Sequence, residues 1–246
     1  MFANGENRLR ADIMQRINQH GANRPRALQT QVGCSSIGVT CDRKLGYQLL
    51  GIQGQRSKTP GWAATIGTAI HTHLETVFSG SDEWLTEQPI SVKYRDFKIP
   101  GTVDLYSIAH RTVIDFKLVG EATLSKARNG RISRQYSVQV QLYGLGLQQA
   151  GYKVDKVAIL FLPRNRELAD AVLWETTFDP TIAHMALDRF DLIDQTIETH
   201  DVNALQMLTV ADAPCNWCDW FDPAAKELTK GCPGVPLTNP LNNLIV

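Results

Sequence analysis

Hydrophobic and polar residues alternate along residues 100–119, on both sides of a short polar break at 109–111. Alternation with a period of two is typical of half-buried strands, so this stretch predicts a β-hairpin. The preceding segment, 89–99, alternates in the same way and predicts a strand that leads into the hairpin. The centre of the chain is therefore expected to form three antiparallel strands.

The rest of the chain shows helical patterns and short apolar runs. Apolar residues at helical spacing predict helices, and apolar runs bounded by Gly, Pro or Asn predict strands. The expected helices cover residues 6–19, 42–50, 61–78, 136–150 and 180–203, and the expected strands cover 154–162 and 171–178. The stretches 51–60 and 121–134 are expected to be connections. This order of elements predicts an α/β fold, on the border of the α+β class, with a central mixed sheet flanked by helices.

Charged residues in the hairpin point to a possible reaction centre. Asp115 and Lys117 are two residues apart and face the same side of their strand, and Asp104 lies on the partner strand. Two carboxylates and an ammonium group on one face are costly to bury unless a cation joins them, and hard divalent cations prefer oxygen ligands. A metal site is therefore expected. The simpler alternative is a solvated hairpin on which Asp115 and Lys117 form an exposed ion pair.

Residues in the two flanking helices favour the metal site. His71 lies one turn before Glu75 on the 61–78 helix, and Gln139 and Tyr143 share a face of the 136–150 helix. A single histidine on a half-apolar helix is usually a core residue, but ahead of a carboxylate hairpin we interpret it as a metal ligand. The chain thus carries His, Asp, Asp-x-Lys and Gln-x-x-x-Tyr in this order.

This order of motifs resembles the PD-(D/E)XK nuclease superfamily, and within it the RecB-like branch, over residues 41–232. The resemblance implies a restriction-endonuclease-like core that binds Mg²⁺ or Mn²⁺. The implied metal ligands are His71, Asp104, Asp115 and the carbonyl group of Phe116. The implied catalytic residues are Asp104, Asp115, Lys117, Gln139 and Tyr143, the last two along the DNA path. Because imidazole is a softer donor than carboxylate, the histidine tilts the expected preference towards Mn²⁺.

Composition limits how DNA could be bound. The chain has 246 residues with 43% hydrophobic content, enough for a proper core, and its formal net charge is zero. Binding must therefore come from local patches, and the basic stretch after the Asp-x-Lys strand is either such a patch or a solvated connection. Its residues are Lys126, Arg128, Arg131 and Arg134. No run of about 18 apolar residues and no signal-peptide pattern occurs, so we expect a cytoplasmic protein without a membrane partner.

The five cysteines are expected to be thiols or metal ligands rather than disulfides. Cys215 and Cys218 form a Cys-x-x-Cys motif, and Cys232 follows after a gap of thirteen residues. Far upstream, Cys41 opens a Cys-x-Arg stretch ahead of a predicted helix, whereas Cys34 does not. We expect Cys34 to be a buried small residue.

This distribution resembles the RecB-like nucleases that carry an iron–sulfur cluster, such as the AddB nuclease domain and the CRISPR-associated adaptation exonucleases, including phage-encoded relatives. The resemblance implies a 4Fe-4S cluster that joins the N- and C-terminal segments, with the ligands Cys41, Cys215, Cys218 and Cys232. The gap before Cys232 is longer than this family usually shows. Zinc on the same thiolates is the alternative, because both centres accept four cysteines and spacing alone does not separate them.

These assignments divide the chain into an N-terminal helical segment with the first cysteine ligand, a nuclease core and a C-terminal cysteine segment, at 1–60, 61–205 and 206–246. The expected function is that of a metal-dependent DNA exonuclease, acting on single strands or DNA ends in recombination, repair or CRISPR-type adaptation. The alternative is a non-catalytic DNA-binding subunit on the same fold. No Gly-x-x-x-x-Gly-Lys-Ser/Thr motif occurs, so unwinding would need a helicase or recombination partner.

Overall fold

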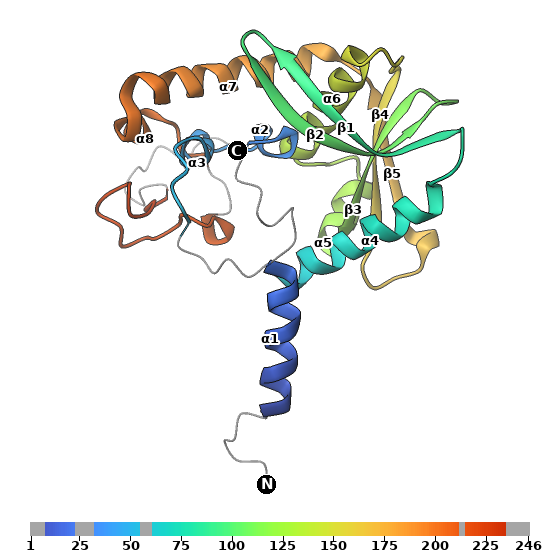
Figure 1. Cartoon of the computed structure of the whole chain (residues 1–246), viewed down its shortest axis with the longest axis horizontal. Helices are drawn as coiled ribbons and strands as arrows, with labels where there is room; N and C mark the ends of the chain where they lie inside the picture. The colour runs from blue at the N-terminus through green and yellow to red at the C-terminus, as the bar shows by residue number, and fades with distance from the viewer. Residues whose placement is uncertain (1–7, 23–31, 55–60, 212–214, 235–246) are drawn as a thin grey trace.

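The structure, a computed structural model, describes residues 8–22, 32–54, 61–211 and 215–234 (Figure 1). Five strands form one sheet in the order β1-β2-β3-β4-β5. Their bounds are β1 Trp84–Tyr94, β2 Phe97–Ser107, β3 Thr112–Val119, β4 Lys156–Pro163 and β5 Val172–Thr177. Helices flank the sheet, which confirms the expected α/β class and is consistent with a restriction-endonuclease-like core (Figure 1).

The strand directions make the sheet mixed. β1, β2 and β3 pair antiparallel as expected, β3 and β4 pair parallel, and β4 and β5 pair antiparallel. Parallel neighbours need a long connection, and here two helices provide it, α5 Glu121–Arg128 and α6 Arg134–Gln149. The connection from β3 to β4 thereby carries α6 onto the sheet.

The expectation of one strand over 89–99 is wrong. The chain reverses at Arg95 and Asp96, so residues 89–94 end β1 and residues 97–99 begin β2. Tyr94 pairs with Phe97 across this turn, and Arg95 has a φ of 47°, the left-handed conformation that tight hairpin turns use. The turn contains no glycine or asparagine, and for this reason the alternation through it was interpreted as one strand.

The expectation that 121–134 is an irregular connection is wrong for its first half, which forms α5. Leu124 and Ala127, three residues apart, are the buried residues of this short helix. The helix ends at Asn129, and Gly130 follows with a φ of 70°. Leu124 is the single large apolar residue in these eight positions, which is too little to give a clear helical period in the sequence.

The other helices lie close to their expected positions. Their bounds are α1 Arg8–Ala22, α2 Cys34–Ile37, α3 Asp42–Leu49, α4 Trp62–Phe78, α7 Pro180–His200 and α8 Ala204–Met207, with single 3₁₀ turns at Leu168–Asp170, Asp201–Asn203 and Cys215–Trp217. α2 and α8 were not expected, because four residues cannot show a helical period. The predicted loop 51–60 falls mostly outside the described residues, as do the first two residues of the 6–19 helix.

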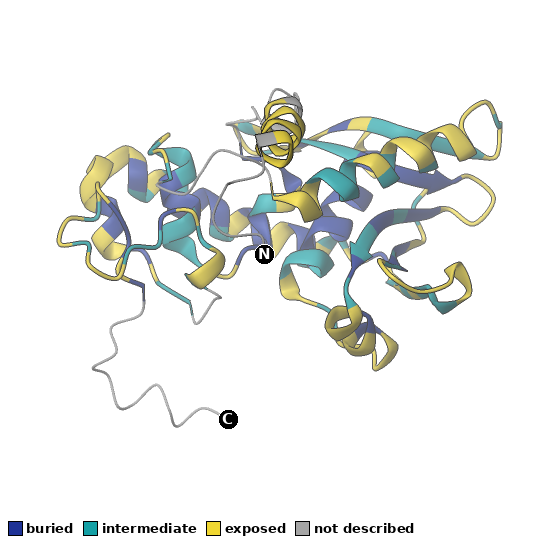
Figure 2. Cartoon of the chain, turned by 90° about the horizontal axis from the view of Figure 1, so that it is seen from below, coloured by how far each residue is buried: buried dark blue, intermediate teal, exposed yellow. Residues whose placement is uncertain are grey.

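The sheet is covered on both faces. Residues 138–147 of α6 are all buried, and this helix lies over the face to which Lys117 points (Figure 2). α4 lies over the opposite face, where its Phe78 ring stacks at 6.3 Å on the ring of Phe116, the strand neighbour of Lys117. α1 projects from the body, and its described side chains are exposed (Figures 1 and 2). Among the described helices, none has the length and apolar character needed to cross a membrane.

A second region gathers at the far end of α7 (Figure 1). It comprises residues 41–54, 204–211 and 215–234, and we call it the cysteine region. Tyr47, Leu205, Trp220 and Cys232 form its small buried cluster, in which the Tyr47 and Trp220 rings stack at 5.4 Å. The guanidinium group of Arg189 on α7 donates hydrogen bonds to the carbonyls of residues 37 and 39, at 3.1 and 2.8 Å, and fixes the chain just before this region.

Candidate functional site

The pairing of β2 with β3 is short and leaves a gap in the sheet. The register joins Leu105 with Ile114 and stops there, so Asp104 and Asp115 lie where the strands part. Asp104 Oδ2 accepts a 2.8 Å hydrogen bond from the backbone N–H of Phe116, which compensates for the missing ladder bond. Both aspartates are buried. The end of the ladder therefore holds two buried carboxylates where the strands part, and we call this parting of β2 and β3, with the side chains that meet there, the carboxylate opening.

His71 approaches this opening from α4. Its Nδ1 lies 3.2 Å from Oδ1 of Asp104 and 3.9 Å from Oε1 of Glu87. Ligand atoms of His71, Glu87 and Asp104 all lie within 4.8 Å of one another. One imidazole nitrogen and two carboxylate oxygens are donors that suit Mg²⁺ or Mn²⁺. The structure thus brings two of the predicted metal ligands together with a third residue that was not predicted.

Glu87 was missed because the strand that carries it was expected to begin at residue 89. Thr86 pairs with Leu105 and Gln88 with Val103, so Glu87 lies across from Asp104. Its φ of 43° is unusual for a strand residue other than glycine. Recognition of the reversal at Arg95 would have set this register and revealed Glu87 from the sequence.

Asp115 is bound on both of its oxygens by predicted site residues. Its Oδ1 accepts a 3.0 Å hydrogen bond from Gln139 Nε2, and its Oδ2 lies 2.7 Å from Lys117 Nζ. Gln139 Nε2 also donates a 2.7 Å hydrogen bond to the hydroxyl of Tyr143. The Asp115 and Lys117 side chains are 2% and 19% exposed, so the alternative of a solvated ion pair is wrong. Asp115 lies outside the close group formed by His71, Glu87 and Asp104.

Burial gives Asp115 an unusual electrostatic state. The pKa of this carboxyl is raised to about 6, and burial is the largest cause. The Lys117 ammonium opposes this rise, and the charge of Asp104 adds to it. Apart from the ion pair with Lys117, Oδ2 of Asp115 accepts no hydrogen bond from the described residues. A buried carboxylate that is so poorly solvated gains from a nearby cation. The donor set of this opening therefore fits a divalent metal ion.

Tyr136 is a second residue that the sequence analysis did not select. Lys117 Nζ lies 5.1 Å from the centre of its ring, and the ring of Phe161 lies 6.2 Å from it. The backbone N–H of Tyr136 donates a hydrogen bond to the capping hydroxyl of Ser133, which fixes the start of α6. The Lys117 ammonium is thus held between a carboxylate and an aromatic face. Spacing could have identified Tyr136, because it precedes Gln139 by three residues on the same helix.

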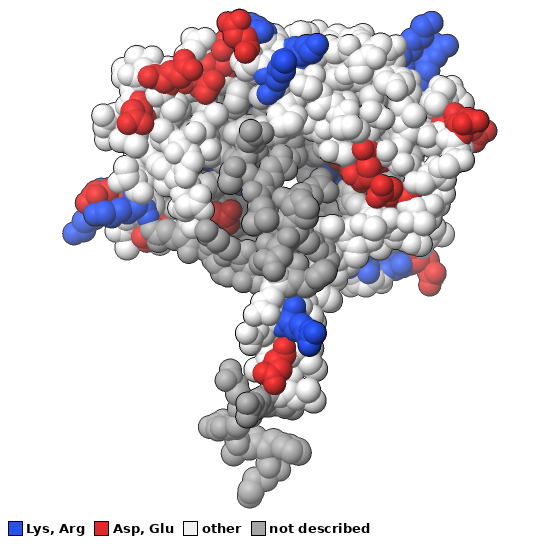
Figure 3. Space-filling model, in the orientation of Figure 1, with Lys and Arg blue, Asp and Glu red and all other residues white. Residues whose placement is uncertain are grey.

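The four basic residues predicted to bind DNA are spread over α5, a loop and the start of α6. Arg128 contacts Glu121 at 3.3 Å and Asp170 at 3.7 Å, so its charge is partly used within the fold. Lys126 and Arg131 are exposed. On the face shown in Figure 3, the described Lys and Arg side chains are scattered among acidic ones. This face could therefore bind a polyanion through local contacts and not through a broad basic surface.

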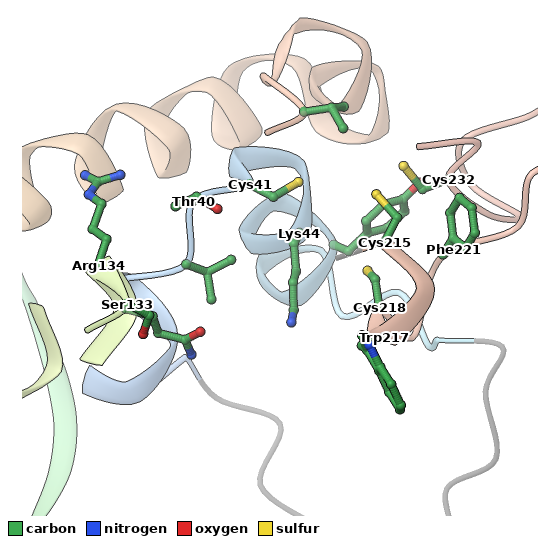
Figure 4. A pocket seen from close by; sticks show the side chains of 14 residues that line it. Thr40, Cys41, Lys44, Ser133, Arg134, Cys215, Trp217, Cys218, Phe221 and Cys232 are labelled. Atoms are coloured by element: carbon green, nitrogen blue, oxygen red, sulfur yellow. The ribbon is translucent and has the colours of Figure 1, made fainter. Parts of the chain in front are cut away.

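Four of the five cysteines line one cavity of about 280 Å³ in the cysteine region (Figure 4). They are Cys41, Cys215, Cys218 and Cys232. Cys34 lies elsewhere, buried beside Gly101, and burial raises the pKa of its thiol to about 12. The structure therefore groups the cysteines as the sequence analysis did, with Cys41 and not Cys34 beside the C-terminal three.

The long gap before Cys232 is closed by backbone pairing. The Cys232 N–H donates a 2.7 Å hydrogen bond to the carbonyl of Trp220, and the Asp222 N–H donates a 2.9 Å hydrogen bond to the carbonyl of Cys232. Arg43 donates to the carbonyl of Leu205 at 2.7 Å and lies 3.7 Å from the sulfur of Cys232. The loop thus returns Cys232 to the Cys-x-x-Cys turn despite the extra residues.

The spacing of the sulfur atoms bears on what the cavity could hold. Four thiolates around zinc at 2.3 Å in a tetrahedron lie about 3.8 Å apart. Among the described residues, no three cysteine sulfurs lie within 4.8 Å of one another. The volume of about 280 Å³ is also far larger than the roughly 10 to 15 Å³ of cavity that holds one water molecule. The cavity therefore fits a larger group better than a single ion.

Comparisons with known proteins identify the fold. No protein-family model and no curated protein matches the chain. Among solved structures, that of SSO0001 is similar at 15% identity and a TM-score of 0.51, covering 86% of this chain and 94% of that chain. An alkaline exonuclease, LHK-Exo from Laribacter hongkongensis, has 10% identity and a TM-score of 0.51, covering 75% and 93%. Its complex with dAMP has 12% identity and a TM-score of 0.50, covering 69% and 89%. At such identities the likeness is one of fold.

Proposed function

We propose that the protein is a metal-dependent deoxyribonuclease, an exonuclease that acts on single strands or DNA ends. The observation that carries the proposal is the pairing of the Lys117 ammonium with buried Asp115, beside the donor group of His71, Glu87 and Asp104. A binding module has no need for such a group. The alkaline exonuclease on the same fold, including its complex with a nucleotide, supports the proposal.

The carboxylate opening would hold one or two Mg²⁺ or Mn²⁺ ions. His71, Glu87 and Asp104 are the proposed ligands, and Asp115 and the carbonyl group of Phe116 complete the set implied by the sequence. When bound, the ion supplies positive charge at the reacting phosphate and makes water a stronger nucleophile. The imidazole ligand favours Mn²⁺ slightly over Mg²⁺.

The remaining groups would position the reacting groups and stabilise the charge that develops on the phosphate. Lys117 would donate hydrogen bonds to the attacking water or to the phosphate oxygens, where negative charge builds up as the phosphorus–oxygen bond breaks. Gln139 holds Asp115 in orientation through its 3.0 Å hydrogen bond, and Tyr143 in turn accepts from Gln139. Because burial raises the pKa of Tyr143 well above its usual value, its hydroxyl remains a neutral hydrogen-bonding group. These contacts give the pair Asp115 and Lys117 a single geometry before the substrate arrives.

The cysteine cavity is proposed to hold a 4Fe-4S cluster on Cys41, Cys215, Cys218 and Cys232, with zinc as the alternative. The wide spacing of the sulfur atoms and the size of the cavity support the larger group. Because the ligands come from both ends of the described chain, the cluster would act as a structural link rather than a redox centre. We propose on this basis that residues 61–205 carry the chemistry and that 1–60 and 206–246 support it.

Biological setting is proposed from the resemblance alone. A nuclease of this kind serves recombination, repair or CRISPR-type adaptation, in the cytoplasm and with DNA as its main partner. Because the sequence has no nucleotide-binding loop for unwinding, a helicase or recombination protein would open duplex DNA for it. Lys126, Arg128, Arg131 and Arg134 are proposed to contact phosphates, with Arg128 contributing least since it is already paired.

The test begins with anaerobic purification, an absorption spectrum and metal analysis. Cleavage of end-labelled single and double strands is then measured with Mg²⁺, Mn²⁺, Ca²⁺ or excess chelator. We expect turnover with Mg²⁺ or Mn²⁺, poor turnover with Ca²⁺ because its looser coordination misplaces the reacting groups, and none with chelator. Undiminished cleavage in chelator would overturn the metal site, and DNA binding without cleavage under any metal would favour the non-catalytic alternative.

A matched pair of variants tests the donor group itself. Glu87→Gln removes one ligand of the close group, and we expect the Mn²⁺ concentration for half-maximal cleavage to rise about 10- to 100-fold. Glu75→Gln is the control, since Glu75 is exposed on the helix of His71 and lies outside the close group. Equal metal requirements for both variants would remove Glu87 from the site.

A further inference from the structure

The cysteine cavity is lined by other groups besides the sulfur atoms. Lys44, Arg134 and Trp217 also line it, and we call these three residues the Trp217 surface. Trp217 is 81% exposed, the largest exposed fraction among the large apolar side chains of the described residues. A free indole ring is a large apolar area with a polar edge, and such groups are enriched where a protein binds another molecule.

Trp217 belongs to a single hydrogen-bonded turn. It lies between Cys215 and Cys218, whose backbones are joined by a 2.8 Å hydrogen bond from the Cys218 N–H to the Cys215 carbonyl. Figure 4 shows the Trp217 ring and the Lys44 side chain extending to the same side of the cavity, while Arg134 lies at its other end. Cations and a flat ring therefore line one continuous hollow. A rigid aromatic group binds with little loss of conformational entropy.

Helix α6 connects this surface to the carboxylate opening. Its first residues, Arg134 and Gln135, line the cavity, and its next turns carry Tyr136 against Lys117 and Gln139 against Asp115. At 1.5 Å per residue, the helix rises only about 7.5 Å between residues 134 and 139. A chain-like ligand that leaves the carboxylate opening along the start of α6 would therefore meet the Trp217 surface.

The residues of the Trp217 surface are better suited to a single strand than to a duplex. Cationic groups attract phosphates, and an exposed indole ring offers a face on which a base can stack. In a duplex each internal base is already stacked between its neighbours, whereas an unpaired strand can present any of its bases to Trp217. The scattered charge on the face in Figure 3 is also better suited to a few local phosphate contacts than to the many that a duplex makes.

We propose that the Trp217 surface binds single-stranded DNA continuous with the strand in the carboxylate opening. A base stacks on Trp217, and neighbouring phosphates lie close to Lys44 and Arg134. The proposal rests on the proposed nuclease function for the identity of the nucleic acid, and it adds the residues that bind the strand beyond the carboxylate opening.

The experiment measures binding without cleavage. The full-length protein is titrated in excess chelator with fluorescently labelled single-stranded DNA of mixed sequence, about 4 to 16 nucleotides long. The same sequence as a blunt duplex and as RNA are the comparison ligands. The variants are Trp217→Ala, Trp217→Phe and Lys44→Ala, with Leu192→Ala on α7 as a control that also removes an exposed apolar side chain. Unchanged unfolding temperature and visible absorption show that each variant keeps its fold and its metal content.

We expect Trp217→Ala to weaken single-strand binding about 5- to 150-fold, the effect of losing one stacked base. Trp217→Phe should keep most of the affinity because it keeps a ring, and Lys44→Ala should reduce the salt dependence of binding. Leu192→Ala should bind as the wild type does. Unchanged affinity of Trp217→Ala, equal dependence of duplex binding on Trp217, or tighter Trp217-dependent binding of RNA would each overturn the proposal.

A second readout separates this proposal from the nuclease assignment. The p-nitrophenyl ester of thymidine 5′-monophosphate is small enough to occupy only the carboxylate opening. With Mn²⁺, wild type and Trp217→Ala should cleave it equally, whereas Trp217→Ala should lose the advantage of longer oligonucleotides. If the wild type cleaves neither ligand, the nuclease proposal fails, and the binding titration still decides the role of Trp217.

Discussion

The carboxylate opening and the cysteine cavity are held together in different ways. The residues of the carboxylate opening come from one stretch of chain, 71–143, and direct polar contacts of 2.7 to 3.2 Å fix most of them. The cysteines come from residue 41 and from 215–232, and a small apolar cluster with the Arg43 contacts brings them near one another. Their sulfurs line a common cavity without forming a close group.

This difference indicates which of the two sites is already arranged before its ligand binds. The carboxylate opening is already arranged, and arrangement without a cation leaves buried negative charge that works against folding. In the described residues no three cysteine sulfurs lie within 4.8 Å of one another, so a bound group would supply a link among all four that the chain does not. Removing a ligand residue from the cysteine cavity should therefore destabilise the protein. Removing a ligand residue from the carboxylate opening should stabilise the metal-free protein.

The largest expected effect on stability belongs to the cysteine cavity. With the proposed 4Fe-4S cluster in place, Cys215→Ser should remove the brown colour of the cluster and lower the unfolding free energy by roughly 4 kcal/mol, the value of a covalent link across so long a loop. Thermal unfolding followed together with visible absorption checks this. Cys34→Ala is the control that should keep the colour. Bleaching by Cys34→Ala but not by Cys41→Ser would reverse our ligand assignment, and a colourless wild type with one zinc would show that the group itself is misassigned.

Lys117→Ala should have a large effect on catalysis, and it should also destabilise the metal-free protein because it leaves the buried Asp115 carboxylate without its ion-pair partner. Loss of one group that stabilises transition-state charge lowers kcat by about 100- to 1000-fold. Lys156→Ala is the control. It removes a lysine of β4 that pairs with Glu175 of β5, away from the opening, and should leave kcat unchanged. Cleavage of labelled single strands under saturating Mn²⁺ is the measurement. Robust cleavage by a clean Lys117→Ala preparation would contradict the catalytic assignment.

Asp115→Asn tests the buried charge in the metal-free protein. The pKa of Asp115 is raised from 3.8 to about 6, so the wild type loses stability as pH rises through this window. A shift of about two units corresponds to at most about 3 kcal/mol. Denaturant unfolding in chelator should show Asp115→Asn more stable than wild type at pH 7 and equal to it near pH 4. An equal or lower stability at pH 7 would mean that the carboxylate is well solvated without metal.

The smallest predicted effect concerns Tyr136. Tyr136→Leu removes the ring 5.1 Å from Lys117 Nζ and should lower kcat by about 2- to 30-fold, the range of a cation–π contact, with KM nearly unchanged. Tyr136→Phe keeps the ring and should restore kcat. If the Phe and Leu variants are equally slow, the hydroxyl or the packing of Tyr136 matters and the contact with Lys117 does not.

Sequence reasoning succeeded where chemistry is carried by local spacing. Asp115 and Lys117 share a strand face, and Gln139 and Tyr143 share a helix face, so the period of each element is enough to pair them. The structure keeps both pairs in hydrogen-bond or ion-pair contact. Cys41 also joins the C-terminal cysteines as expected, although that grouping came from a resemblance and not from spacing.

Prediction from the sequence failed where a contact depends on the register between two elements. Glu87 meets Asp104 only because the chain reverses at Arg95 and Asp96, a turn whose residues give no strong signal. The exposure of Trp217 likewise could not be foreseen, since an indole beside two cysteines is as easily buried as free. Both depend on which segments meet in space, and periodicity along one segment carries no such information.

The separation of the cysteines also sets an order of events during synthesis of the chain. Arg43 and Cys232, which are in contact in the fold, are 189 residues apart. At about 5 to 20 residues per second, a ribosome needs roughly 10 to 40 s to make the chain between them. The sheet with its carboxylates can form in that interval, whereas the cysteine cavity cannot. A group bound by all four cysteines could therefore enter only after residue 232 has been made, when the sheet has had time to form, and a chain that stops before residue 215 would lack three of the four cysteines.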